Sequence, residues 1–80
     1  MHHEEISAKI KGYGLSDDLK TRLGVVVKDG VSRNMIYKAF KNGPITPLAS
    51  IILVEAETLI RVHMENVSDK LFQMELETAT

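Results

Sequence analysis

The stretch that decides the fold is residues 22–40, which read RLGVVVKDGVSRNMIYKAF. Gly30 can take the positive φ that a tight turn requires. Ser32 follows as a helix N-cap, because a serine hydroxyl can accept a hydrogen bond from a backbone N–H of the first turn. Apolar residues then recur at helical spacing: Met35, Ile36, Ala39 and Phe40. The stretch therefore predicts a helix, a turn at Gly30, and a second helix over about 33–42.

Two more helices are expected before the turn. Ile6 and Ile10 lie four residues apart, which predicts a short helix over about 3–11, and the glycines of Gly12-Tyr13-Gly14 end it. Ser16 is the expected N-cap of the next helix, over about 17–28. Acidic residues follow Ser16 in the first turn, where the helix dipole favours negative charge.

The longest helix is expected at the C-terminal end. Thr46 and Pro47 are typical of an N-cap and a first helical residue. Beyond them a nearly unbroken apolar stripe predicts a helix over about 46–77: Ile45, Leu48, Ile52, Ala56, Leu59, Ile60, Met64, Val67, Leu71 and Met74. Residues 66–69 leave two alternatives open, a kink or a separate last helix capped by Ser68. The expected fold class is all-α: one domain over residues 1–80, with four to five helices.

Composition excludes several classes of protein. Hydrophobic residues make up 44% of the chain and charged residues 26%, which is a globular rather than a disordered composition. Without cysteine, the chain has no disulfide and no thiolate metal site. The longest aliphatic run, residues 51–54, is far shorter than the ~20 apolar residues of a membrane span. No apolar signal segment opens the sequence, so we expect a cytoplasmic protein that binds no membrane.

Charge is distributed unevenly along the chain. The net charge is only −1, but residues 1–43 hold eight lysines and arginines against five acids, whereas residues 44–80 hold two against six. Within 20–41, Asp29 is the only acid among six basic residues. Such segregation can give a nearly neutral protein a basic face for nucleic acid. The alternative is that these lysines only solvate helix surfaces.

Residues 30–39, GVSRNMIYKA, resemble the turn and recognition helix of Cro/Xre-like phage repressors. That family has a small apolar residue in the first helix, Gly four residues later, an apolar residue and often Ser after it, and Ile or Val six after the Gly. The matching residues here are Val26, Gly30, Val31, Ser32 and Ile36. Two positions depart from the pattern: Val26 replaces the usual Ala, and Asp29 replaces an apolar residue.

The resemblance implies a helix-turn-helix over about 16–42 that binds double-stranded DNA. Its two helices would cross at close range after a reversal of three or four residues, with Val31 beneath the turn and Ile36 between the helices. It implies that base edges are read by Ser32, Arg33, Asn34, Tyr37 and Lys38. Phosphate contacts are expected from Lys20, Arg22, Lys28, Lys41 and Asn42.

The long C-terminal helix predicts a homodimer, because the stripe exceeds what the preceding helices can cover. The expected interface residues are Leu48, Ile52, Leu59, Ile60, Met64, Val67 and Leu71. The alternative is a helix that breaks at 66–69 and folds back over its own core. We expect no cofactor and no metal, since His2 and His3 are adjacent and diverge on a helix.

The sequence favours a DNA-binding regulator over an enzyme. No serine, histidine and acid are linked as a catalytic triad, and no glycine-rich phosphate loop follows a strand. A second class remains open: an assembly, adaptor or antitoxin-like protein that uses the same fold for protein contacts.

Overall fold

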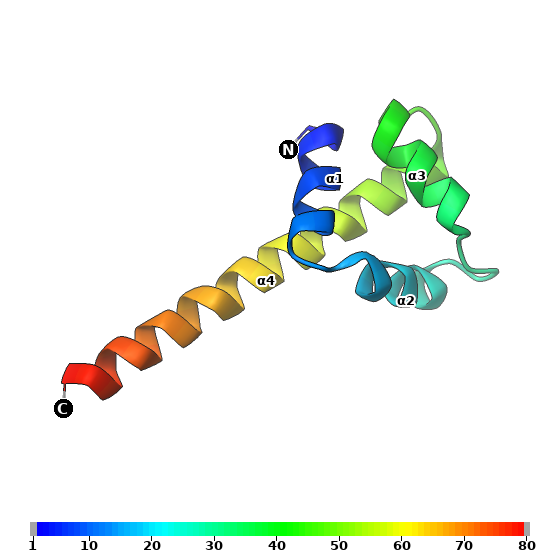
Figure 1. The fold of residues 1–80 in the computed structure, drawn as a ribbon. Helices are drawn as coiled ribbons and strands as arrows, with labels where there is room; N and C mark the ends of the chain where they lie inside the picture. Colours follow the sequence, from blue (N-terminus) through cyan, green and yellow to red (C-terminus); the bar gives the residue numbers. More distant parts are fainter. Residues whose placement is uncertain (1, 80) are drawn as a thin grey trace.

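The computed structural model describes residues 2–79, and side chains through Val67. It contains helices α1 (His3–Gly12), α2 (Ser16–Val26), α3 (Arg33–Asn42) and α4 (Pro47–Ala79), with no strand in residues 2–79. The predicted all-α class is therefore confirmed. The three short helices gather around the first half of α4, and the second half of α4 extends away from them (Figure 1).

The ends of α2 differ from the prediction. Leu15, not Ser16, occupies the N-cap position, and its side chain is buried while its N–H donates to the carbonyl of Ile10. Because Leu15 is buried at the N-cap position, α2 begins at Ser16, one residue before the predicted start, and no side chain caps it. At the other end the helix stops at Val26 rather than about residue 28, and Val27 is extended. The run of β-branched valines disfavours continued helix.

The connection between α2 and α3 corrects the expected crossing of these helices. It comprises residues 27–32, longer than a three- or four-residue reversal. Helix α3 packs mainly against α1 and α4, and α2 packs mainly against α4, rather than the two packing against each other. Val26, expected at the crossing, is 48% exposed. Gly30 has the predicted positive φ, +74°, and Val31 is buried beneath the turn as expected.

Capping residues start the last two helices as predicted. The Ser32 hydroxyl accepts a hydrogen bond from the N–H of Met35 at 3.2 Å, and the Thr46 hydroxyl accepts one from Ala49 at 3.0 Å. Helix α4 then continues without interruption to Ala79, so the separate last helix and the fold-back are both wrong. No helix among the described residues is long and apolar enough to span a membrane.

The core joins α1, α2 and α3 to the first half of α4. Its largest fully buried side chains are Ile6, Ile10, Leu19, Leu23, Ile52 and Ile60. Burial of one such side chain is worth about 1.5–3 kcal/mol. These contacts hold α3 against α1 and α4, so that one face of α3 is fixed inward and the other outward.

Burial in this core corrects part of the predicted dimer interface. Ile52 and Ile60 are 1% and 2% exposed, because α1 to α3 cover this part of the stripe within the same chain. Leu48 and Leu59 are half-buried against the same core. Only Met64 and Val67 of the predicted set are exposed, and Leu71 lies outside the described side chains.

Candidate nucleic-acid interface

Helix α3 has one buried and one exposed face. Ala39 and Phe40 are buried in the core, and Ile36 packs against it. The residues at positions 1, 2, 5, 6 and 9 of the helix are all exposed: Arg33, Asn34, Tyr37, Lys38 and Lys41. This set, called here the α3 outer face, has two amide- or hydroxyl-bearing side chains, three cations and no acid. It can both donate to and accept from a polar partner.

The N-terminal end of α3 adds positive potential to this face. Its first turn contains no acidic residue. The first backbone N–H groups of a helix lack intrahelical partners, and the helix dipole places partial positive charge there. The Ser32 hydroxyl accepts from one of these N–H groups, so its oxygen serves as the cap while its own hydrogen can still be donated.

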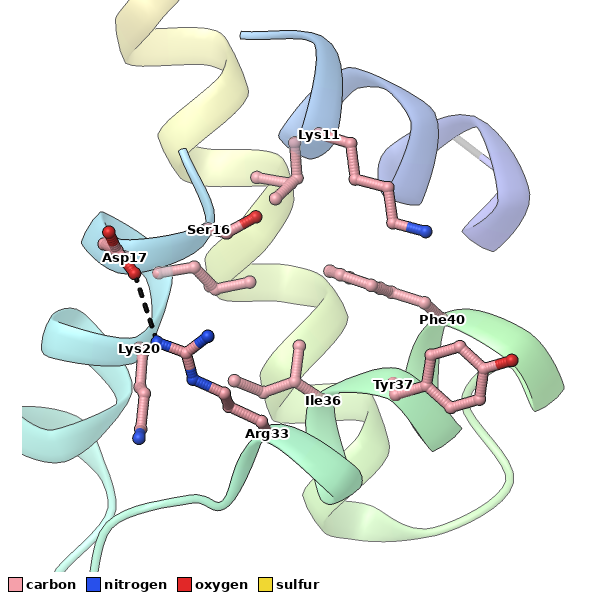
Figure 2. A pocket seen from close by; sticks show the side chains of 10 residues that line it. Lys11, Ser16, Asp17, Lys20, Arg33, Ile36, Tyr37 and Phe40 are labelled. Carbon is pink, nitrogen blue, oxygen red and sulfur yellow. Dashed lines mark hydrogen bonds and ion pairs between the residues drawn. The ribbon is translucent and has the colours of Figure 1, made fainter. Parts of the chain in front are cut away.

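A groove separates the start of α2 from α3. Its apolar floor is formed by Ile10, Leu19, Ile36 and Phe40, and its volume is about 180 Å³. Polar side chains from three helices surround this floor (Figure 2): Lys11, Ser16, Asp17, Lys20, Arg33 and Tyr37. The groove therefore brings Lys20, a predicted phosphate contact, together with the predicted base-reading residues Arg33 and Tyr37.

Arg33 crosses this groove to an acid on α2. Its guanidinium lies 3.5 Å from the carboxylate of Asp17 (Figure 2). Both side chains are largely exposed, at 78% and 91% of their surface. Exposed ion pairs contribute little free energy and are screened by salt. Arg33 is thus held near the groove by a contact that a phosphate or a guanine edge can replace.

The far end of α3 holds two more predicted phosphate contacts. Lys41 borders a cleft with Glu4, Ser7 and Tyr37, and Asn42 borders a second cleft with Lys38 between α3 and α4. Both residues are exposed. Glu4 is an acid close to this end of α3, and it reduces the positive potential there at low salt.

Two other predicted phosphate contacts lie away from these grooves. Lys28 is exposed in the connection between α2 and α3. The phosphate contact predicted for Arg22 is the one that the structure corrects most clearly. The Arg22 guanidinium pairs with Glu55 of α4, and the side chain lines a cleft between α2 and α4. Because Glu55 engages it, Arg22 ties α2 to α4 and does not join the α3 outer face.

Two residues near this site were not predicted from the sequence, Lys11 and His3. Lys11 at the end of α1 joins the rim of the groove. The Nδ1 atom of His3 lies 2.7 Å from the carbonyl oxygen of Phe40, and a Cβ at Gly43 would approach the His3 ring to 3.0 Å. His3 therefore secures the C-terminal end of α3. No local pattern indicates this contact, because 37 residues separate its partners.

A ring contact joins the start of the fold to α4. Tyr13, in the turn after α1, stacks on His63 with ring centroids 4.6 Å apart. His63 is half-buried. Within the described residues, no group of three or more histidines, cysteines and acids is placed to hold a metal ion.

Comparisons with known proteins do not extend this description: no protein family, characterised protein or solved structure matches the chain.

Proposed function

We propose that this chain binds double-stranded DNA through the α3 outer face, as a small regulator of the phage-repressor type. One observation carries the proposal. Four of the five predicted base-reading residues, Arg33, Asn34, Tyr37 and Lys38, project from one exposed helix face whose opposite face is fixed in the core. A rigid helix with outward side chains is what a major groove accommodates.

The side chains of this face have the chemistry of base readout. A guanidinium such as that of Arg33 can donate two hydrogen bonds to guanine O6 and N7, and an amide such as that of Asn34 can bind adenine N6 and N7. Each such pairing discriminates against a wrong base by about 1–3 kcal/mol. Tyr37 and Lys38 lie one turn further along and extend the reach of the helix to bases or phosphates.

Cations around the face supply phosphate contacts that fix its orientation. Lys11 and Lys20 border the groove beside Arg33, and Lys41 and Asn42 lie at the other end of α3. The α3 N-terminus adds backbone N–H groups at its own end. These contacts release counterions, so affinity should fall steeply as salt rises.

Selection from a randomised duplex pool tests the proposal. The protein is titrated by fluorescence anisotropy at several salt concentrations, and the retained DNA is sequenced. We expect enriched, pseudo-palindromic sites bound at least ~10³-fold more tightly than random duplex at physiological salt. Absence of enrichment, with weak binding that salt abolishes entirely, would contradict sequence-specific binding.

A second candidate function is an adaptor or assembly protein, favoured by a different surface. Ile45 is 72% exposed and Met35 is also exposed, and both line the cleft between α3 and α4. Apolar residues grouped beside a basic helix face suit a protein partner. An adaptor of this kind should bind DNA either not at all or through electrostatic attraction alone. That result would contradict sequence-specific DNA binding.

A further inference from the structure

We infer that the groove between α2 and α3 binds a small aromatic carboxylate, and that this ligand competes with DNA. The groove is the one lined by Lys11, Lys20, Arg33 and Tyr37 above an apolar floor. Arg33 and Tyr37 also belong to the α3 outer face. The competition therefore rests on the proposed DNA binding, whereas the binding of the carboxylate does not.

Cations from three helices surround the groove. Lys11 belongs to α1, Lys20 to α2 and Arg33 to α3, and all three side chains are exposed. Asp17 is the one acid among the residues that line the groove, so positive charge is in excess there. Lys11 lies on one side of Phe40, and Arg33 lies on the other side (Figure 2). The electrostatic potential of the groove therefore favours an anion.

The walls of the groove require more of a ligand than negative charge. Ile36 is half-buried, and the ring of Tyr37 is 58% exposed. The methylene stems of the three basic side chains add apolar surface beneath their charged ends. A bare inorganic anion leaves this surface in water, whereas an aromatic ring covers it. The ring can also stack on Tyr37 and take a cation on its face.

The size of the groove limits the ligand to one or two rings. Its volume of about 180 Å³ is smaller than the ~300–1,000 Å³ of pockets that hold drug-sized ligands. A long alkyl chain would extend out of such a space into water. An aromatic carboxylate therefore suits the groove better than a fatty acid does.

Neighbouring clefts do not combine these features. The cleft between α3 and α4 is lined by one cation, Lys38, among the residues that the structure describes. The cleft between α2 and α4 contains Arg22, but Glu55 already pairs with that guanidinium. Charge and aromatic surface together thus favour the groove between α2 and α3.

Titration of the full chain with 2-naphthoate, without DNA, tests the binding. We expect saturation with a Kd of about 0.1–1 mM for a ligand of this size. The methyl signals of Ile36 should shift in NMR spectra, while those of Ile45 should not, because Ile45 is 72% exposed in the cleft between α3 and α4. Equal shifts at Ile36 and Ile45, or no saturation up to about 10 mM, would overturn the inference.

Two control ligands separate charge from ring. The neutral 2-naphthylmethanol keeps the ring and lacks the carboxylate, and octanoate keeps the carboxylate and lacks the ring. Each should bind at least about threefold more weakly than 2-naphthoate. Equal affinity for either control would contradict an aromatic carboxylate as the ligand.

The variant Asp17→Asn gives a result that misfolding cannot imitate. It removes the acid that pairs with Arg33, so 2-naphthoate should bind about two- to fivefold more tightly. Asp18→Asn is the matched control, because Asp18 lies in the same first turn of α2 and lines a different cleft. Its affinity should change by less than about 1.5-fold, since water and salt screen the more distant charge. Unchanged or weaker binding by Asp17→Asn would contradict the inference.

Competition with DNA is measured in a separate titration at constant ionic strength. 2-Naphthoate should release a selected duplex, whereas acetate at the same concentration should not, and the duplex should weaken 2-naphthoate binding to the same degree. Simultaneous binding of both would contradict the competition. If no duplex is selected at all, the proposed DNA binding fails, and the titrations without DNA still decide whether the groove binds the carboxylate.

Discussion

The Arg33→Ala, Lys38→Ala double variant is expected to lose roughly 30- to 20,000-fold in affinity for a selected duplex. The estimate follows from about 1–3 kcal/mol for each good base contact, at 1.4 kcal/mol per tenfold. Both side chains are exposed, and Arg33 has only its solvent-exposed pair with Asp17. The fold should therefore be retained, which circular dichroism checks, while anisotropy titration measures the affinity.

A charge-matched control separates readout from general electrostatics. Lys9→Ala with Arg61→Ala removes the same number of positive charges from α1 and α4. We expect this control to lower the affinity by less than about threefold at physiological salt, because neither residue belongs to the α3 outer face. Equal losses in the two double variants would mean that the α3 outer face contributes charge alone.

Ile52→Ala is expected to lower the free energy of unfolding by about 2–5 kcal/mol. The Ile52 side chain is fully buried where α4 meets the other helices, so its truncation removes packing and leaves a cavity. That loss is a large part of the ~5–15 kcal/mol that stabilises a typical domain. Urea denaturation at one fixed protein concentration measures it.

Val54→Ala is the control for this substitution, two residues further along the same helix. Val54 is exposed, and surface truncations usually change stability by less than about 0.5 kcal/mol. Equal losses of stability in Ile52→Ala and Val54→Ala would contradict the place of Ile52 in the core.

Local chemistry was enough to predict much of the fold. A hydroxyl-bearing residue just before a helical pattern predicts an N-cap, and Ser32 and Thr46 cap their helices in this way. Gly30 has the positive φ that the turn needs. These features depend on hydrogen bonds within three residues of the cap, or on one residue's own backbone. The helical period of α3 likewise predicted that Ile36, Ala39 and Phe40 face the core, but Met35, which it placed on the same face, is 46% exposed.

Features that depend on distant partners were not predictable from local pattern. The stripe of α4 is apolar along most of its length, and the sequence alone does not say which part of it the other three helices cover. Arg22 resembles its basic neighbours in the sequence, but Glu55, 33 residues away, engages it. The contact of His3 with the carbonyl oxygen of Phe40 in α3 also joins residues that lie far apart in the sequence. The spacing around Val26 resembles that of the phage repressors, but α2 and α3 do not cross closely there, because the connection between the two helices is longer.

The most direct test of the central proposal is a titration of ¹⁵N-labelled protein with the selected duplex, followed by amide chemical shifts. We predict that the largest shifts fall in residues 32–42 and in the groove at Lys11 and Lys20, while amides of 64–67 change little. Shifts concentrated on α4, or spread evenly over all exposed lysines, would contradict DNA recognition by the α3 outer face.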